Sequence, residues 1–495
     1  MFHVYFALFL MGCTKNVSAD TPLPPTSNPP ASGTPEVPKT PPQRPNFLFI
    51  ISDDQSWIHT SMEAYPFIST PNFDEIAKNG LYFQNAFAAA PSCTPSRSAI
   101  ITGQEFWQLE SGAVLLSDYP SEKISYQHVL QQAGYVAGFT GKGWGPGRTT
   151  EADKPTGQAF NRHRVNSGDM KGEADIVANF EEFLGSMTKD VPFSFWIGSK
   201  DPHRPFSPDA VNRFENQDMT GLLPAFLPDT EQIRFDLSGY LYESERFDQQ
   251  VGEILALLKR FDRYDNTVIV ITSDNGMDFG RAKPQNYTYG VQVPLAIYWT
   301  GLEDKGEIID DFIQLSDIAP TFIELAGVEV PAEMTGESLV PYMKVAERGR
   351  LEQQERDAAY SGYERHAPFI RGGELNLTYP RRAVYTKDFV YIRNYHPERW
   401  PAGDPPVAIE GHPIALSDAD GNPLEPYYSL SIAKRPAEEL YDLRVDPDQM
   451  VNVAANADYA EVLETLRNRL LAKQQATQDP ILEDVDYFQQ FPSYP

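Results

Sequence analysis

Runs of consecutive apolar residues constrain the fold of this 495-residue chain more than any other feature of its sequence. Residues 46–51 read NFLFII and residues 267–272 read TVIVIT, without the alternation of a half-exposed strand. Such runs are typical of strands buried on both faces, as in a parallel sheet. Segments with helical periodicity, such as 174–187 and 235–260, separate these runs from others at 136–140, 192–198 and 293–299. The alternation predicts an α/β fold in which a large, mainly parallel sheet carries helices on both faces.

The pattern changes near residue 372. Residues 382–395 predict a β-hairpin with Lys387 and Asp388 at its turn, and 460–473 predict a helix. We therefore expect a main domain over 45–372 and a smaller C-terminal subdomain over 373–495, an antiparallel sheet covered by one helix. The tail from residue 479 is expected to return over the main domain.

The N-terminus has the pattern of an export signal. Residues 1–11 are apolar apart from His3, too short a stretch to span a membrane, and Leu-Met-Gly-Cys at 10–13 resembles a bacterial lipobox. We predict a signal peptide over 1–12, lipidation of Cys13, and a flexible Pro-rich tether over 13–44. The expected location is the periplasm or cell surface of a bacterium, with membrane contact through the lipid alone. Ordinary secretion is the alternative.

The charge of the chain restricts its partners. The formal net charge is −28, which argues against binding nucleic acid, or polyanions in general, across the whole surface. An anionic substrate would need a local basic pocket or a metal.

Polar residues follow the predicted buried strands. Asp53 and Asp54 come after 46–51, and Asp274 and Asn275 come after 267–272. The carboxyl ends of parallel strands are where α/β sheets place ligands, and oxygen donors suit a hard divalent cation. The alternative for the aspartate pair is a turn with solvated side chains.

Two further strand ends carry candidate catalytic groups. Lys142 lies in a glycine-rich turn after 136–140, within reach of an oxyanion, although such turns are common. His203 follows 192–198 beside Lys200, Asp201 and Arg204; it is either catalytic or structural, the usual fate of a lone histidine.

Cys93 is the one cysteine of the chain besides Cys13, the predicted lipidation site. It lies among Pro and Ser residues ahead of the apolar run 99–101, so we expect it at the entry to a helix. Taken alone, such a cysteine is more often a small buried apolar residue than a functional one.

The residues around Cys93 nevertheless carry a family resemblance. Cys-Thr-Pro-Ser-Arg at 93–97, followed by Ala-Ile-Ile-Thr-Gly at 99–103, resembles the signature of type I, formylglycine-dependent sulfatases of the alkaline phosphatase superfamily. Lys283 lies eleven residues before Pro294, as the family lysine lies before its Val-Pro. Other positions resemble the two metal motifs, the Gly-Lys motif and the Asp-Pro-His motif of that family: Asp53-Asp54, Asp274-Asn275, Lys142 and His203.

The resemblance implies a cofactor set. Cys93 would be converted to formylglycine by a formylglycine-generating or anaerobic sulfatase-maturing enzyme. Ca²⁺ would be bound by the modified residue 93 together with Asp53, Asp54, Asp274 and Asn275.

It also implies catalytic roles. One oxygen of the hydrated formylglycine would attack sulfur, and Arg97 would hold that residue. Lys142 and Lys283 would bind the sulfate oxygens, and His203 would protonate the leaving oxygen.

One position departs from the family. Many sulfatases have a histidine two residues after the Gly-Lys lysine, where this chain has Trp144. The base for the last step would then be water or another group; His59, His163 and His366 are candidates, each with a structural role as the alternative.

The substrate is indicated by weaker signals. Segments at 364–366, 379–382 and 395–404 resemble the sulfamidase-like branch, which acts on sulfated sugars, while bacterial relatives act on algal polysaccharides such as ulvan. A subsite for the sugar could include Trp144, Arg365, His366, Arg371 and Arg382. The alternatives are surface ion pairs for the cations and a core position for the tryptophan.

The sequence therefore predicts a sulfatase that hydrolyses sulfate esters of a sulfated polysaccharide or its oligosaccharides. The alternatives are an N-sulfoglucosamine sulfohydrolase, a phosphoesterase of the same superfamily, and an inactive glycan-binding surface lipoprotein.

Overall fold

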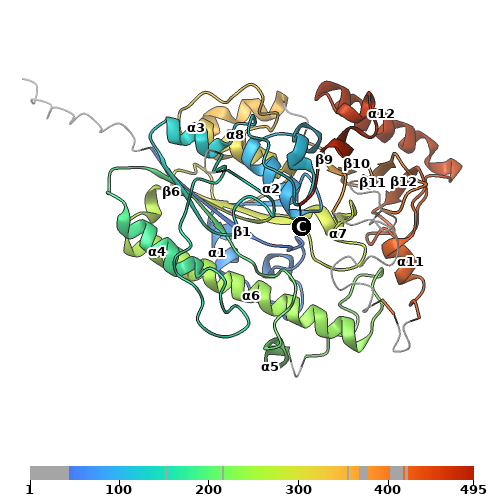
Figure 1. Ribbon diagram of the computed structural model, residues 1–495, viewed down its shortest axis with the longest axis horizontal. Helices are drawn as coiled ribbons and strands as arrows, with labels where there is room; N and C mark the ends of the chain where they lie inside the picture. The colour runs from blue at the N-terminus through green and yellow to red at the C-terminus, as the bar shows by residue number, and fades with distance from the viewer. Residues whose placement is uncertain are drawn as a thin grey trace, which may run out of the picture. The chain divides into compact units, whose positions relative to one another are not determined.

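The computed structural model describes residues 44–150, 153–214, 217–353, 356–366, 377–401, 416–417 and 422–494 (Figure 1). The predicted signal, Cys13, nearly all of the tether, and Arg371 lie outside the described residues.

A large sheet forms the centre of the described chain, and β1, its first strand in sequence, lies between β5 and β6. Its pairs are parallel except where β7 runs antiparallel to β6 and β2, which confirms the predicted mainly parallel sheet. In spatial order the strands of the described sheet are β4 (Gln158–Ala159), β3 (Val136–Gly141), β5 (Phe193–Gly198), β1 (Asn46–Ser52), β6 (Thr267–Ser273), β7 (Gln292–Tyr298), β2 (Leu81–Phe87) and β8 (Glu307–Gln314).

Helices cover both faces of this sheet (Figure 1). Successive residues of β1 point to opposite faces: Phe47 and Phe49 enter one hydrophobic core, and Leu48 and Ile50 enter the other. All four are at most 1% exposed, which explains the uninterrupted apolar run. One face carries α1 (Pro71–Asn79), α4 (Ile176–Ser186) and α6 (Glu231–Arg260), and the other carries α2 (Cys93–Thr102), α3 (Tyr126–Gln132) and α8 (Ile318–Leu325).

A smaller antiparallel sheet follows, as predicted. Leu466 and Leu470 of α12 (Ala460–Ala476) pack against its strands. The sheet begins earlier than expected, because β9 lies upstream of residue 373. In spatial order the strands are β12 (Glu438–Asp442), β11 (Phe389–Asn394), β10 (Arg381–Thr386) and β9 (Ala358–Tyr363).

The C-terminal tail returns to the main domain, as predicted. Ile481 and Phe488 pack in one cluster with Phe106 and Trp107. Farther along the tail, Ser493 Oγ donates a hydrogen bond to the Leu115 carbonyl, and the Tyr494 N–H donates to the Leu116 carbonyl, both at 2.7 Å.

The remaining described helices are short. They are α5 (Ala210–Phe214), α7 (Thr288–Val291), α9 (Val340–Met343), α11 (Tyr427–Ile432), and the 3₁₀ helices η1 (Ser61–Glu63), η2 (Phe106–Gln108), η3 (Glu110–Ala113), η4 (Tyr264–Asn266), η5 (Leu315–Asp317), η6 (Val345–Gln353), η7 (Ala457–Tyr459), η8 (Pro480–Leu482) and η9 (Tyr487–Gln490). Within the described ranges, no helix has both the length and the apolar composition needed to cross a bilayer.

Candidate active site

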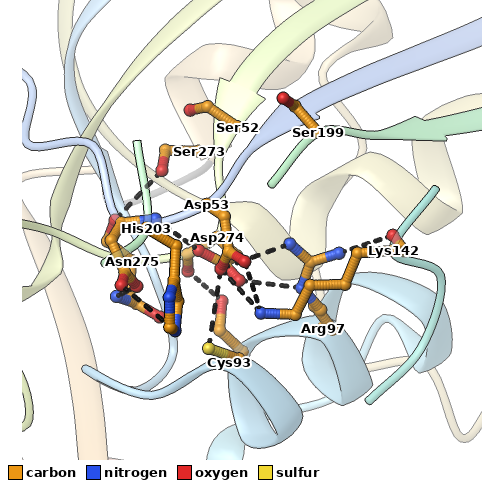
Figure 2. Close-up of polar contacts among 12 residues, drawn as sticks. Ser52, Asp53, Cys93, Arg97, Lys142, Ser199, His203, Ser273, Asp274 and Asn275 are labelled. Atoms are coloured by element: carbon orange, nitrogen blue, oxygen red, sulfur yellow. Dashed lines mark hydrogen bonds and ion pairs between the residues drawn. The ribbon is translucent and has the colours of Figure 1, made fainter. Parts of the chain in front are cut away.

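The ends of two neighbouring strands bring four oxygen-bearing side chains together. β1 and β6 pair in register with Ser52 opposite Ser273, so the residues that follow them are adjacent. The Asp54 N–H donates to Asp274 Oδ1 at 3.1 Å, and Asn275 Nδ2 donates to Asp54 Oδ1 at 2.7 Å. Asp53, Asp54, Asp274 and Asn275 are each at most 1% exposed. Figure 2 shows Asp53, Asp274 and Asn275 reaching from the strand ends toward the helix that begins at Cys93.

Cys93 is the first residue of α2 and is 2% exposed. Its Sγ lies 3.6 Å from Asp53 Oδ1 and 3.6 Å from Lys283 Nζ. Possible ligand atoms of Asp53, Asp54 and Cys93 all lie within 4.8 Å of one another. Burial raises the pKa of the Cys93 thiol, and the nearby lysines offset this in part. The unmodified side chain is therefore a protonated thiol, which is a poor nucleophile.

Arg97, one turn along α2, fixes the helix to the residues that follow β6 and β3. Its Nε donates to Asp274 Oδ2 at 2.7 Å, and its Nη1 donates to the carbonyls of Lys142 and Gly143 at 2.8 and 3.0 Å. Burial acts to lower the pKa of Arg97, but Asp274 and Asp53 outweigh it, so the pKa is raised. The guanidinium stays charged and locks the position of Cys93.

Two lysines approach the same carboxylates. Lys142 Nζ lies 2.6 Å from Asp53 Oδ2, and Lys283 Nζ lies 2.8 Å from Asp54 Oδ2. Burial would raise the pKa of Asp53, but Lys142 and His203 more than offset it and lower the pKa to about 2. The carboxylate of Asp53 is thus ionised and available as a ligand.

His203 presents one ring nitrogen to this cluster. Its Nδ1 lies 2.6 Å from the Arg204 carbonyl oxygen, which can accept but not donate, so the hydrogen is assigned to Nδ1. Its Nε2 lies 3.8 Å from Asp54 Oδ2, and its side chain is 22% exposed. This orientation leaves Nε2 facing the site and accessible to a substrate.

The donor set fits a hard divalent cation. Among the described residues, the buried Asn275 Oδ1 has no hydrogen-bond partner, and it lies beside three buried carboxylates. Carboxylate and amide oxygens are the ligands that Ca²⁺ takes in proteins, and they are poor ligands for soft metals.

Trp144 lines a cavity of about 660 Å³ together with Asp53, Lys142 and His203. Its indole Nε1 donates to Ser98 Oγ at 2.8 Å, and its other edge packs against the main core. The residue therefore combines the two roles considered for it, a core contact and a wall of the cavity.

Of the four cationic residues predicted to bind substrate, the three that the structure describes lie in different environments. His366 lies beside the site, with Nδ1 2.9 Å from Oγ of Ser92, the residue before Cys93. Arg365 is 4% exposed and bonds to the Phe491 carbonyl and Ser493 Oγ of the C-terminal tail.

The prediction that Arg382 binds substrate is wrong. This side chain is 0% exposed, and it forms ion pairs with Glu364 at 2.8 Å and with Asp479 at 2.7 Å. A guanidinium enclosed in this way holds the small sheet to the tail and cannot contact a dissolved sugar.

The three candidate bases also differ in position. His59 is buried against the Tyr240 hydroxyl, and burial lowers its pKa to about 3, which indicates a neutral structural histidine. His163 Nε2 lies 3.0 Å from Glu182, and its side chain is 42% exposed. Of the three, His366 is the one placed beside the cysteine.

Several residues at the site were not predicted. The Asp53 N–H donates to the Asp201 carbonyl at 2.9 Å, and Arg246 of α6 holds the Asp201 carboxylate through two bonds of 2.6 Å. Arg164 and Asn161 line the cavity. Of these, Asp201 belongs to the Asp-Pro-His motif, whereas no motif marks Asn161, Arg164 or Arg246.

Comparison with known proteins places these features in a family. The sulfatase family model matches residues 45–328, and a second, described as N-sulphoglucosamine sulphohydrolase, C-terminal, matches residues 282–402. The chain is 27% identical to an ulvan-active sulfatase of Formosa agariphila, covering 90% of this chain and 82% of the relative. It is 26% identical to N-sulphoglucosamine sulphohydrolase of Homo sapiens, covering 88% and 91%. The structure of BT4656 in complex with its substrate D-glucosamine-2-N,6-O-disulfate shares the fold, with a TM-score of 0.62 at 22% identity over 90% of this chain and 99% of that one.

Proposed function

The chain belongs to the sulfatase family, and from this premise we propose that it hydrolyses sulfate esters of a sulfated polysaccharide or its oligosaccharides. The observation that carries the proposal is the clustering of Cys93 with four buried oxygen donors, two lysines and His203. Of this cluster, Asp53, Lys142 and His203 line the cavity. Sulfatases are sulfuric ester hydrolases, so the residues can be given roles in breaking a sulfur–oxygen bond.

We propose that Cys93 is converted to formylglycine by a maturing enzyme of the formylglycine-generating or anaerobic type. The protonated state of the buried thiol supports this, because the unmodified side chain offers little nucleophilic character. Hydrated formylglycine would supply an oxygen nucleophile for sulfur at the start of α2.

Asp53, Asp54, Asp274 and Asn275 would hold Ca²⁺ together with the modified residue 93. A bound Ca²⁺ would offset the charge of the sulfate group and of the carboxylates around it. Arg97 would act by positioning α2 against Asp274, and it stays charged while doing so.

The cationic side chains would recognise the sulfate group itself. Lys142 and Lys283 are directed into the site by their bonds to Asp53 and Asp54, so their remaining N–H groups can donate to sulfate oxygens. His203 Nε2 would carry the proton that the leaving oxygen needs, a general-acid role supported by its exposed ring edge.

N-Sulfoglucosamine sulfohydrolysis is the second candidate. It is favoured by the match of residues 282–402 to the C-terminal model of that enzyme group. The two candidates differ in the bond that breaks, which is S–O in an ester and S–N in a sulfamate.

Mass spectrometry of the peptide that contains residue 93 tests the mechanism. The expected product of maturation in the native host is formylglycine, about 18 Da lighter than cysteine. Cys93→Ala should fold normally and release no sulfate from ulvan, carrageenan, fucoidan or heparan oligosaccharides. A native-host sample with an intact thiol, or full activity of Cys93→Ala, would refute the assignment. Phosphate release without sulfate release would instead favour a phosphoesterase, and binding without turnover would favour an inactive glycan-binding protein.

We also propose that the chain is exported and anchored through a lipid on Cys13, on the basis of the sequence at 10–13. Labelling cells with a tagged fatty acid tests this. Incorporation should disappear in Cys13→Ser, and an unlabelled wild-type protein would contradict the anchor.

A further inference from the structure

The cavity beside Cys93 extends well beyond the space that a sulfate group needs. At about 660 Å³ it falls within the range of sites for complete small ligands, about 300–1,000 Å³. Its inner part contains Asp53, Lys142 and His203, where the scissile sulfate is proposed to bind. Its outer part is formed by residues between β4 and α4, among them Asn161, Arg164 and Glu173, and by the residues after β5.

The charged residues that line this cavity do not all balance one another. Lys142 pairs with Asp53, and Lys200 pairs with Glu173 at 2.8 Å. Arg164 is different: within the described residues, its guanidinium forms one hydrogen bond, at 3.4 Å to the Gly172 carbonyl, and no ion pair. The outer cavity therefore contains one positive charge that no carboxylate of the described protein neutralises.

This surplus charge is notable because the chain as a whole carries −28. A protein this acidic repels anions over most of its surface, so an anionic ligand is attracted only where cations gather. Guanidinium groups also match the planar geometry of carboxylates and the oxygen spacing of sulfates, which they bind in a bidentate manner.

Trp144 gives the same cavity a flat apolar wall. The hydrogen bond to Ser98 and an edge-on contact with Tyr119, 5.2 Å between ring centroids, fix the orientation of the indole. A ring held this way suits the face of a sugar, whose substituents then extend toward the polar walls.

We propose that Arg164 binds a second anionic group, a uronate carboxylate or another sulfate, on the saccharide that carries the scissile sulfate. The substrate class is therefore an acidic or multiply sulfated saccharide rather than a neutral sugar with one sulfate ester. This inference rests on the proposed sulfatase function and deepens it.

The test compares Arg164→Gln with Arg162→Gln in the mature full-length enzyme. Arg162 is a matched control, since it lies two residues away, pairs with Glu182 and does not line the cavity. Sulfate release is measured from three kinds of probe. The first is a sulfated disaccharide that contains a uronate, compared before and after reduction of its carboxyl group. The second is D-glucosamine-2-N,6-O-disulfate, compared with D-glucosamine 6-sulfate. The third is 4-nitrophenyl sulfate.

Arg164→Gln should lower kcat/KM about 10- to 100-fold on a doubly anionic sugar, mainly through KM, because a charge-assisted hydrogen bond is lost. On 4-nitrophenyl sulfate and on the singly charged sugars, Arg164→Gln should change kcat/KM by less than about twofold. Arg162→Gln should change kcat/KM by less than about twofold on every probe. A loss of kcat/KM on the uronate disaccharide alone identifies a carboxylate subsite. A loss of kcat/KM on the disulfate alone identifies a sulfate subsite.

Two outcomes overturn the inference in distinguishable ways. If wild-type enzyme carrying formylglycine releases no sulfate from any probe, the proposed function fails, and the inference fails with it. If wild-type enzyme is active but Arg164→Gln matches Arg162→Gln on both doubly anionic sugars, the second-anion site is wrong and the sulfatase function stands.

Discussion

Lys142 and Lys283 each pair with one of two adjacent aspartates, Asp53 and Asp54, yet they differ in exposure. The side chain of Lys142 is 23% exposed, whereas that of Lys283 is 2% exposed. If the side chain is truncated to alanine, water can take the place of the Lys142 ammonium group but not that of Lys283. The two lysines should therefore contribute similarly to catalysis and differently to stability.

Lys142→Ala and Lys283→Ala are each expected to lower kcat about 10²- to 10³-fold, the loss typical of removing one transition-state donor. In the metal-free protein, Lys283→Ala should also reduce the free energy of unfolding by about 3 kcal/mol, because it removes the cation that pairs with the buried Asp54 carboxylate. Sulfate-release kinetics and urea denaturation measure the two effects. Equal losses of stability in the two variants would contradict the argument from burial.

Glu243 makes stability depend on pH. Burial, and then the negative charge of Asp201, raises its pKa to about 8. The folded state therefore holds a proton that the unfolded state releases near pH 4.5, so this group destabilises the fold progressively as pH rises from 4.5 to 8. Wild-type protein should lose about 4 kcal/mol of stability from this source between pH 5 and pH 9.

Glu243→Gln removes that titration and keeps the oxygen that accepts from the Ser207 N–H. Urea denaturation at pH 5 and pH 9 should show a smaller difference for this variant than for wild type. A difference that is unchanged, or that has the opposite sign, would exclude a raised pKa at this position.

Single residues also show which parts of the site can be predicted from the sequence. Asp53 and Asp274 were predictable as neighbours because each follows an apolar run, and parallel strands end at one edge. Arg382 was not, because its partners Glu364 and Asp479 are 18 and 97 residues away in sequence. A motif containing arginines does not distinguish a guanidinium that faces a cavity from one enclosed by carboxylates.

At the scale of elements, the apolar runs predicted the buried strands, whereas β8 and β4 escaped prediction. β8 reads EIIDDFIQ and lies at an edge of the sheet, so Asp310 and Asp311 interrupt its apolar pattern. β4 spans two exposed residues at the opposite edge. Strands at sheet edges need no continuous apolar run, and periodicity alone therefore gives them little signal.

The C-terminal tail supports one wall of the cavity from the far end of the chain. Leu115 and Leu116 line the cavity, and their carbonyls accept from Ser493 and Tyr494. The guanidinium of Arg148 stacks on the Tyr494 ring. This wall therefore depends on residues that no motif connects to it.

Deleting residues 493–495 should raise KM for a saccharide about 3- to 10-fold and leave kcat on 4-nitrophenyl sulfate within about twofold, because the wall loosens while the reacting groups stay in place. Leu482→Ala serves as the control, since this tail residue is 39% exposed and lies outside the cavity lining. An unchanged KM in a deletion variant that melts normally would show that the tail has no part in substrate binding.

For the whole molecule, the formal charge of −28 opposes the approach of a long polyanion even when a local site attracts it. The Debye length shortens from about 30 Å at 0.01 M salt to about 8 Å at 0.15 M. Added salt therefore screens the repulsion between the net charge of the protein and an approaching polyanion before it weakens contacts within the cavity.

Raising NaCl from about 10 to 150 mM should accordingly increase kcat/KM on a sulfated polysaccharide several-fold. The value for 4-nitrophenyl sulfate should change less, because this small substrate experiences the global field over a shorter path. Initial-rate measurements at matched pH test this. A fall with added salt on the polysaccharide would show that local attraction dominates the encounter.

The position of β1 between β5 and β6 also determines when the site around Cys93 can form during synthesis of the chain. About 180 residues separate Cys93 from the end of β6, roughly 10–40 s of synthesis at about 5–20 residues per second. Before then Asp274 and Asn275 have not been made, and the enclosure that leaves Cys93 2% exposed cannot form. The proposed conversion of Cys93 by a second enzyme would then have to occur within this interval, or on a chain kept unfolded for the proposed export, since the finished fold encloses the thiol.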